Sequence, residues 1–390
     1  MSINIENAKK AFEREFQCIP GTIVCAPGRV NIIGEHTDYN HGFVLPMALE
    51  QATYMLAARR PDRQLKGWAV NMNARCVAGL DQRERRPDAP WMDYVIGVAD
   101  ELAKLGYPLT GANLMIQGDV PVGCGLSSSA ALEMAALRMF ESLGGFRLDG
   151  PGAARLGQRV ENHFLGLSTG IMDQFISRCG RAGCALFLDC RTYEYELIPV
   201  AFSDAVFIIA NTRCARGLTA TKYNERVAEC TEAVRVLTER TGKGGTHLRD
   251  FALADLEACR EHLSDVSYRR ARHVITENTR TLDACGAMRA GDAEALGALM
   301  NASGDSLRAD YEVTSPELDA MTEAARALPG CLGARMTGAG FGGCTINLVV
   351  ETEADRFAQS LMAEYSRRTG LTGEIITSRP GDGAKILLQS

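Results

Sequence analysis

The chain has 390 residues, of which 46% are hydrophobic and 23% charged, and its formal net charge is −6. These values are close to the averages for globular proteins, so the chain can bury a sizeable core. The acidic balance argues against a nucleic-acid partner, for which a basic face would be expected. A polyanionic substrate would therefore have to be met by local positive potential from backbone N–H groups, an arginine or a metal ion.

No apolar run approaches the roughly 18 residues that a membrane span needs. The segment over 1–16 is charged and lacks the apolar centre of a secretory signal, so we expect a cytoplasmic protein with no membrane partner. The 13 cysteines are odd in number and include no CxxC pair. This pattern favours reduced, buried cysteines over a disulfide framework or a zinc site.

Strand-like and helix-like segments alternate along the chain without the regular βαβ rhythm of a doubly wound sheet. In chain order, we predict a strand over 112–120, a helix over 127–144 opened by serine caps and closed by Gly144, strands over 184–190 and 205–211, a helix over 219–242, a helix from Pro316 capped by Ser315 or Thr314, and a strand over 344–350. This is an α+β pattern. The strands restart after Pro199, which places a domain boundary there and predicts domains over 1–199 and 200–390.

The segment over 26–49 carries a dense polar group between apolar runs, with Glu35, His36 and Asp38 within four residues. Such a group suits a loop that offers several hydrogen-bond acceptors to a polyol. A solvated turn and a metal cluster are the alternatives, and the histidines of the segment are not spaced to share a helix face. Arg29, earlier in the segment, is either part of this site or one half of a surface ion pair.

The segment over 118–135 predicts a phosphate-binding loop. A strand runs into Gly123 and Gly125, and three serines then open a helix rich in Ala, Leu and Met. Glycine lets the backbone approach a ligand closely, and the first N–H groups of a helix have no partner within the helix. The helix dipole adds positive potential there, and a serine hydroxyl can bind Mg²⁺. No lysine follows the glycines, so this is not a Walker loop; an ordinary serine-capped helix is the alternative.

Two carboxylates and a tyrosine also stand out. Asp173 lies among the apolar residues of the segment over 170–177, so we expect it to be partly buried, which is costly for a carboxylate unless it is paired or used. Glu161 lies on a helix-like stretch and is a candidate second metal ligand, or else it pairs with a neighbouring arginine. Tyr223 lies on the apolar stripe of the helix over 219–242 and by itself fits the core.

The segment over 336–350 contains Gly338, Gly340 and Gly343, which formally match GxGxxG. A dinucleotide-binding fingerprint follows a strand and opens a helix, whereas these glycines precede a strand. We therefore expect a glycine-rich loop that packs near the phosphate site, with a bare turn as the alternative.

Taken together, these segments resemble galactokinases of the GHMP small-molecule kinase superfamily, and the resemblance covers nearly the whole chain. PGRVNIIGEHTDYN is similar to the galactokinase signature, PVGCGLSSSAALE to the phosphate loop of the superfamily, and GAGFGGC to its third motif; GIMDQFIS and NTRCARGLTATKYNERV also follow galactokinases. The resemblance implies a ribosomal-S5-like N-terminal domain beside a ferredoxin-like C-terminal domain, with the active site between them. It also implies transfer of the γ-phosphoryl group of ATP to the C1 hydroxyl of galactose.

The same resemblance assigns roles to particular residues. The ATP phosphates would be wrapped by Gly123, Cys124, Gly125, Leu126, Ser127, Ser128 and Ser129. The Mg²⁺ ion would be held by Ser129 and Glu161. The sugar would be bound by Glu35, His36, Asp38, Gly170 and Tyr223. The reacting hydroxyl would face Asp173, as a general base or as an orienting group, and Arg29 would stabilise both Asp173 and the transferred group.

Other functions remain open at this stage. Another sugar-1-kinase of the superfamily, acting on N-acetylgalactosamine or arabinose, is the nearest alternative. A non-catalytic sensor of galactose and ATP is disfavoured because such relatives lack a Ser-Ala pair that is present here as Ser129 and Ala130. A metabolite oxidoreductase would rest on the formal GxGxxG match alone. The partners that we expect are galactose and ATP, and a monomer is the expected oligomeric state.

Overall fold

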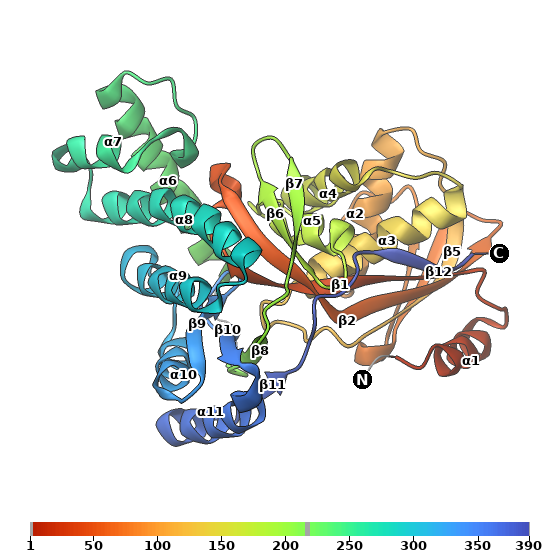
Figure 1. Cartoon of the computed structure of the whole chain (residues 1–390). Helices are drawn as coiled ribbons and strands as arrows, with labels where there is room; N and C mark the ends of the chain where they lie inside the picture. Colours follow the sequence, from red (N-terminus) through yellow and green to blue (C-terminus); the bar gives the residue numbers. More distant parts are fainter. Residues whose placement is uncertain (1–2, 215–218, 390) are drawn as a thin grey trace.

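The computed structural model describes residues 3–214 and 219–389, whose strands form two sheets (Figure 1). In these ranges the larger sheet has the strand order β12-β1-β2-β5-β3-β4, with β6 paired to β2 and β7 to β6. Its strands are β1 Thr22–Ile33, β2 Phe43–Arg60, β3 Gln64–Ala69, β4 Ala74–Gly79, β5 Gly111–Gly118, β6 Cys184–Asp189, β7 Tyr195–Pro199 and β12 Lys385–Gln389. The smaller sheet has the order β11-β8-β10-β9. Its strands are β8 Ala205–Asn211, β9 Cys331–Thr337, β10 Cys344–Val350 and β11 Glu374–Ile376.

The long strand β2 holds the larger sheet together because its two ends pair with different neighbours. Its first residues, Phe43 and Val44, pair with β6, while Thr53–Arg60 pairs with β5. The pairing of β3 with β5 is parallel, and the other ladders are antiparallel. The strand β12 pairs with β1, so the end of the chain returns to the sheet in which it began.

Helices flank both sheets. In Figure 1, α2 to α5 lie on the larger sheet, α10 and α11 lie beside the smaller one, and α6 to α8 project from one end of the molecule. The helices are α1 Ile5–Phe16, α2 Pro90–Lys104, α3 Ser128–Gly144, α4 Gly150–Arg159, α5 Met172–Cys179, α6 Thr219–Thr241, α7 Leu253–Ala258, α8 Asp265–Ala290, α9 Ala293–Ser306, α10 Pro316–Ala327 and α11 Ala354–Thr369. Short helical turns are η1 Asp38–Asn40, η2 Val70–Met72, η3 Val160–Phe164, η4 Leu248–Asp250, η5 Arg260–His262, η6 Leu307–Tyr311 and η7 Glu351–Glu353.

The structure confirms the predicted α+β pattern and each predicted strand and helix, with ends close to those expected. The cap of α10 is also as predicted, because the Ser315 hydroxyl accepts from the Leu318 N–H at 3.3 Å. The predicted ends of α3 need correction. Gly144 is the last helical residue and Gly145 closes the helix with φ 71°, while the Ser127 side chain makes no capping hydrogen bond at the other end.

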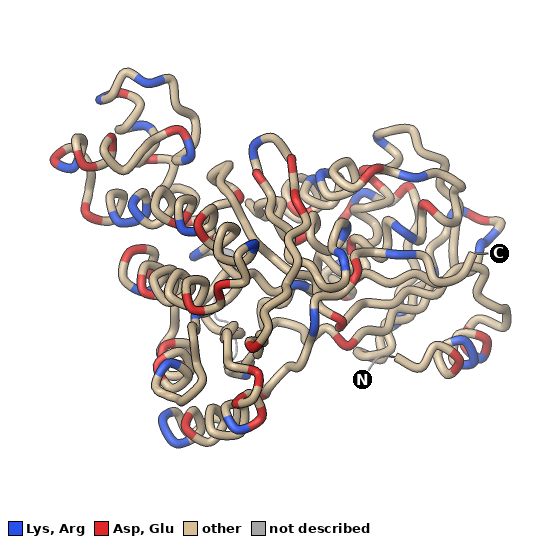
Figure 2. The backbone as a smooth tube through the Cα atoms, in the orientation of Figure 1, with Lys and Arg blue, Asp and Glu red and all other residues tan. Residues whose placement is uncertain are grey.

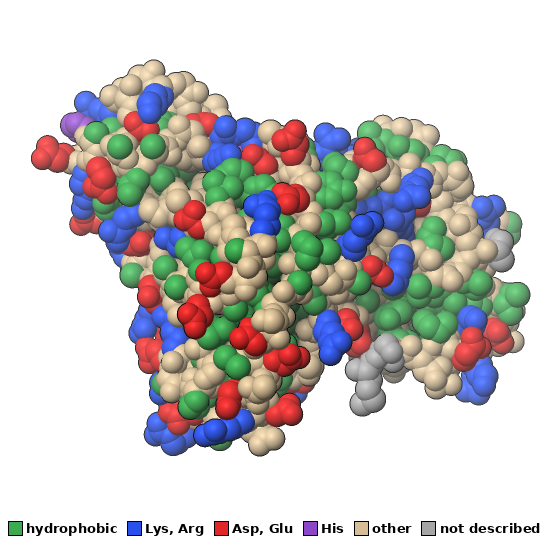
Figure 3. Space-filling view, viewed as in Figure 1, with side chains coloured by type: hydrophobic (Ala, Val, Ile, Leu, Met, Phe, Trp, Pro, Cys, Tyr) green, Lys and Arg blue, Asp and Glu red, His purple; other side chains and the backbone are tan. Residues whose placement is uncertain are grey.

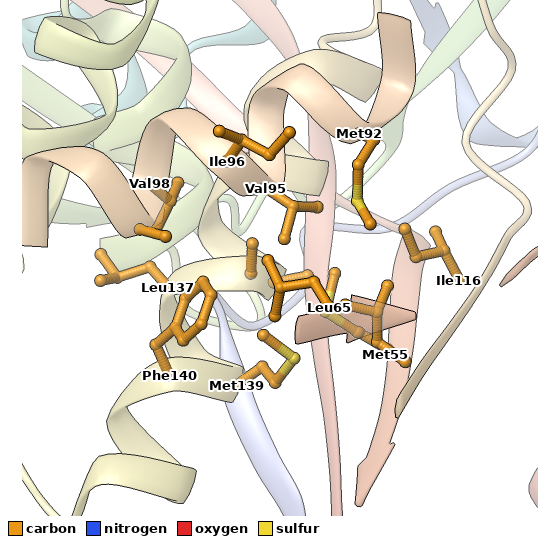
Figure 4. Close-up of a cluster of buried hydrophobic side chains, with 14 of the residues drawn as sticks. Met55, Leu65, Met92, Val95, Ile96, Val98, Ile116, Leu137, Met139 and Phe140 are labelled. Carbon is orange, nitrogen blue, oxygen red and sulfur yellow. The ribbon is translucent and has the colours of Figure 1, made fainter. Parts of the chain in front are cut away.

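The largest core lies where α2 and α3 pack on the larger sheet. Figure 4 shows Leu65 of β3 close to Val95 of α2 and to Leu137 and Phe140 of α3, and all four residues are at most 1% exposed. Burying an aliphatic or aromatic side chain of this size stabilises a fold by about 1.5–3 kcal/mol. This core holds α3, whose first turn belongs to the predicted phosphate loop, on the sheet.

Charged residues of both signs are interspersed along the backbone (Figure 2). The face shown in Figure 3 carries both signs without a wide single-sign area. None of the 13 cysteines, all of which lie in the described ranges, forms a disulfide. No helix within residues 3–214 and 219–389 is long and apolar enough to cross a membrane.

A buried ion pair ties α3 to α5. Arg178 Nη2 and Nη1 donate to the two carboxylate oxygens of Glu141 at 2.7 and 3.0 Å, and both side chains are at most 2% exposed. Arg178 also donates to the Leu148 carbonyl at 2.9 Å. The pair therefore fixes the relative position of two helices that carry residues of the site.

We expect Glu141→Ala to lower the free energy of unfolding by about 3–5 kcal/mol, because it leaves the Arg178 guanidinium buried without its carboxylate. The measurement is urea unfolding followed by circular dichroism. Glu232→Ala is the control, since Glu232 pairs with Arg235 on the exposed surface of α6 and such pairs contribute about 0–1 kcal/mol. Equal losses in the two variants would contradict the prediction.

Candidate active site

The loop between β1 and β2 is clamped at both ends by α8. The Gly34 N–H donates to Glu277 Oε1 at 3.0 Å, and the Phe43 N–H donates to Asn278 Oδ1 at 2.9 Å. Gly34 has φ 97°, and a Cβ there would lie 2.6 Å from the Phe43 carbonyl oxygen, so the turn requires glycine. The chain therefore presents the polar group of this loop on a rigid frame.

Glu35 lies at the joint between the two sheets, and its carboxylate is 1% exposed. It forms an ion pair of 2.7 Å with Arg335, a fully buried residue of β9. Its oxygens also accept from the Asn31 amide, the Thr337 hydroxyl and the Gly338 N–H. Burial raises the pKa of Glu35, and the Arg335 charge opposes that rise. The glycine-rich turn after β9 thus packs on the β1–β2 loop.

His36 belongs to a cluster of aromatic rings. Its ring centroid lies 5.7 Å from that of Tyr223 on α6 and 4.8 Å from that of Tyr311, and its Nδ1 is 2.9 Å from the Tyr39 hydroxyl. The Tyr39 and Tyr311 hydroxyls are hydrogen-bonded at 2.7 Å. Burial lowers the pKa of His36 to about 3, so the imidazole is neutral at physiological pH. The cluster brings Tyr223 beside the β1–β2 loop.

Asp38 is held by backbone donors at the start of η1. The Tyr39 N–H donates to Oδ1 at 3.0 Å and the Met172 N–H to Oδ2 at 3.4 Å. A Cβ at Gly170 would collide with the Asp38 carboxylate, so the close approach of the two segments requires glycine there. Burial and the charge of Asp173 raise the pKa of Asp38 to about 6.

Arg29 and Asp173 form a bidentate ion pair. Arg29 Nε and Nη2 donate to Oδ1 and Oδ2 of Asp173, both at 2.8 Å, and the third nitrogen donates to the Gly125 carbonyl. The side chain of Arg29 is 5% exposed, whereas that of Asp173 is 30% exposed. The Ser127 hydroxyl donates to Asp173 Oδ2. Asp173 is therefore partly buried, as expected, and Arg29 is not half of a surface ion pair.

The predicted phosphate loop turns sharply through left-handed backbone. Gly123, Gly125 and Ser127 have φ values of 76°, 84° and 58°. The Ser127 hydroxyl donates to Asp173, and the predicted cap of α3 by Ser127 is therefore not formed. Cys124 and Leu126 point into the hydrophobic core. These two residues therefore offer a ligand only their backbone groups.

Glu161 lies in η3 with its carboxylate buried against the same site. Burial and the charge of Asp173 raise its pKa, and hydrogen bonds with Thr169, Gln174 and Ser129 oppose part of that rise. The alternative partner was a neighbouring arginine, but Arg159 pairs instead with Glu101 at 2.8 Å. Glu161 thus faces other carboxylates and polar groups.

Ser129 and Glu161 supply oxygen donors to one place, which is the ligand chemistry that Mg²⁺ prefers. Among residues 3–214 and 219–389, no group of three or more histidine, cysteine, aspartate or glutamate side chains is arranged to hold a metal. Mg²⁺ in phosphoryl-transfer sites is usually held by one or two protein oxygens together with substrate phosphates. The donor set therefore fits a metal that arrives with a nucleotide and not a dedicated protein cage.

The predicted catalytic, sugar-binding and metal-binding residues meet in a cavity of about 420 Å³, a volume suited to a small ligand. Its lining consists of Arg29, Glu35, His36, Asp38, Tyr94, Ser129, Glu161, Leu167, Ser168, Thr169, Gly170, Met172, Asp173, Tyr223, Asn224, Gly338 and Ala339. Of the predicted phosphate-loop residues, Ser129 lines this cavity. The sequence analysis missed Tyr94 and Thr169, because Tyr94 lies in an ordinary amphipathic helix and Thr169 in a loop without a motif.

Comparisons with known proteins agree with this arrangement. The galactokinase galactose-binding signature matches residues 10–59, and the N-terminal and C-terminal domain models of GHMP kinases match residues 93–181 and 284–367. A galactokinase from Roseiflexus sp. (strain RS-1) is 43% identical over 96% of this chain and 95% of its own. The galactokinase of Homo sapiens is 40% identical over 98% of this chain and 96% of its own.

Solved structures agree as well. The crystal structure of Lactococcus lactis galactokinase complexed with galactose superposes with a TM-score of 0.93 at 36% identity, covering 98% of this chain and 99% of that one. Mevalonate kinase of Methanococcus jannaschii superposes with a TM-score of 0.65 at 19% identity, covering 93% of this chain and 99% of that one, which shows a shared fold. This chain belongs to the galactokinase family of the GHMP kinases.

Proposed function

We propose that the cavity transfers the γ-phosphoryl group of ATP to the C1 hydroxyl of galactose, which gives galactose 1-phosphate and ADP. The observation that carries this proposal is the Arg29–Asp173 pair, which presents a partly exposed carboxylate beside the phosphate loop. Phosphoryl transfer depends mainly on positioning and on electrostatic stabilisation, and this pair can supply both.

The sugar is held on one side of the cavity by the β1–β2 loop and the residues packed on it. Hydrogen-bond acceptors and donors for the sugar hydroxyl groups come from Asp38, His36 and Tyr223. Gly170 lies against Asp38, so the Gly170 backbone is also close to the sugar. Glu35 already accepts from several protein donors, so its part in sugar binding includes fixing the loop. A rigid site of this kind favours one arrangement of hydroxyl groups over another.

At the reacting hydroxyl, Asp173 accepts the proton of the C1 O–H. Its two oxygens are oriented by Arg29, so a free lone pair remains on the carboxylate to face the substrate. In a loose transition state the proton moves late, as the new P–O bond forms. The Arg29 guanidinium, which is shared between Asp173 and the Gly125 carbonyl, stabilises negative charge on the transferred group.

On the nucleotide side, the loop from Gly123 to Ser129 wraps the phosphates with its backbone, at the N-terminus of α3. Ser129 and Glu161 would hold Mg²⁺, which would neutralise phosphate charge. We also propose that the protein is a cytoplasmic monomer with domains over 1–199 and 200–390, joined by the return of β12 to β1. The absence of disulfides among the 13 cysteines fits a reducing compartment.

We expect Asp173→Asn to lower kcat by at least ~10²-fold, because the amide cannot accept the proton and is mispaired with Arg29. The measurement is ADP release at saturating galactose and MgATP. Calorimetry with ADP serves as the control, and ADP should still bind to the variant. A variant that keeps more than about half of the parent kcat would remove Asp173 from the reaction.

The preference between galactose and glucose tests the sugar side. The two sugars differ only in the orientation of the C4 hydroxyl, so a buried acceptor aimed at the axial group is left unpaired by glucose. Such a mismatch can reach ~10⁴-fold in kcat/KM, and we expect that order of preference for galactose. We expect Asp38→Ala to weaken galactose binding with little change in ATP binding. Comparable kcat/KM values for the two sugars would contradict both the substrate and the role of Asp38.

The raised pKa of Asp38 predicts a pH dependence. The ionised carboxylate is the stronger acceptor, so galactose binding should weaken as pH falls through about 6 and Asp38 becomes protonated. Titration calorimetry with galactose between about pH 5 and 7.5 measures this. The Asp38→Asn variant, which has no such titration, should show a flat profile over that range. A parent profile as flat as that of Asp38→Asn would rule out Asp38 as the titrating acceptor.

A further inference from the structure

Glu133 is a fully buried carboxylate beneath the phosphate loop, and it does not line the cavity. It lies on α3 four residues after Ser129, so both side chains leave the same face of the helix. Its Oε1 has no hydrogen-bond partner among the described residues. A carboxylate in that position costs free energy that an apolar side chain would not.

The other oxygen of Glu133 accepts a hydrogen bond from Gln174, the residue that follows Asp173. Gln174 Nε2 donates to Glu133 Oε2 at 3.0 Å, and Gln174 is also fully buried. The same Gln174 side chain lies next to Glu161 and lowers the pKa of that carboxyl group. The Gln174 amide therefore stands between a carboxylate on α3 and one in η3, while its own backbone continues directly from Asp173 on α5.

The helix α4 packs closely against the Gln174 side chain. Gly157 of α4 faces it, and a Cβ at Gly157 would lie 2.8 Å from Gln174 Cγ, 2.6 Å from Met134 Cε and 3.2 Å from Glu133 Oε2. The helix approaches so closely only because this residue is glycine. The Glu133–Gln174 contact is thus a tightly enclosed joint between α3 and α5.

Burial and the charges of Glu161 and Asp173 raise the pKa of Glu133 well above its ordinary value. The Gln174 amide donates to Glu133 and lies next to Glu161, so it stands between two carboxylates that repel each other. Without an acceptor at position 133, the amide would be free to turn away from Glu161. The place of Glu161 relative to Ser129 would then no longer be fixed.

We propose that Glu133 and Gln174 are positioning residues that hold Glu161 against Ser129, so that both present oxygens to the metal of bound MgATP. The proposal rests on the proposed role of Ser129 and Glu161 in binding Mg²⁺. Neither positioning residue touches the substrates; each acts through Glu161. Groups of this kind, which orient a metal ligand, commonly change metal affinity by about 10–100-fold when they are removed.

The test uses two variants that keep side-chain length and remove the hydrogen bond, Glu133→Met and Gln174→Met. Glu133→Gln is the matched control, because its amide carbonyl can still accept from Gln174. Three quantities are measured: the Mg²⁺ concentration for half-maximal rate, the KM for galactose, and the Mg²⁺-dependent dissociation constant of ADP by calorimetry. The melting temperature of each variant reports whether it is folded.

We expect both methionine variants to raise the Mg²⁺ requirement and the Mg²⁺-dependent dissociation constant of ADP by about tenfold, with the galactose KM within about twofold of the parent. Glu133→Gln should match the parent in all three quantities. A purely structural role would lower the melting temperature without changing the Mg²⁺ requirement, and that outcome would overturn the proposal. So would equal effects of the methionine and glutamine substitutions at position 133.

Glu161→Gln separates this proposal from the one on which it rests. If it raises the Mg²⁺ requirement while the methionine variants do not, the positioning role is wrong and the metal role of Glu161 stands. If Glu161→Gln leaves the Mg²⁺ requirement unchanged, Glu161 is not a metal ligand, and the positioning role falls with it.

Discussion

The Arg29–Asp173 ion pair is the interaction on which the rest of the site depends. It joins β1 to α5, and through the Gly125 carbonyl and the Ser127 hydroxyl it also fixes the proposed phosphate loop. A bidentate, charge-assisted pair is favourable in only one geometry, so it sets the orientation of the Asp173 carboxylate as well as its distance from Arg29. A buried guanidinium without this carboxylate would be strongly unfavourable, which is why the three segments must come together.

Buried carboxylates surround this pair, and their burial lowers the stability of the fold. Asp38 and Glu161 both carry raised pKa values because they are buried near Asp173, and Glu133 carries one because it is buried near Glu161. Arg29, which lowers the pKa of Asp38, is already engaged with Asp173. A cluster of carboxylates with few cations favours a bound cation, so the same crowding that costs stability would favour the proposed metal–nucleotide complex.

The resemblance to galactokinases predicted the fold and most of the residues that line the cavity, and Asp173 among apolar neighbours was expected from the residues alone to be partly buried. The structure adds the reasons for two glycines: Gly34 has a positive φ, and Gly170 leaves room for Asp38. Other features depend on contacts between distant segments. The Ser127 hydroxyl turns to Asp173, 46 residues away, instead of capping its helix, and no local pattern indicates that choice. For the same reason the sequence does not distinguish Glu133 from an ordinary helix residue, because its contact with Gln174 of α5 is seen only in the structure.

The most direct test of this account is a crystal structure of the protein with galactose and the Mg²⁺ complex of a non-hydrolysable ATP analogue. The account predicts that the C1 oxygen of the sugar lies within about 3.2 Å of an Asp173 carboxylate oxygen. It also predicts that the γ-phosphate lies beside Arg29 and that the metal contacts Ser129 and Glu161. A sugar bound with its C1 hydroxyl directed away from Asp173, or a metal bound without Ser129 and Glu161, would contradict it.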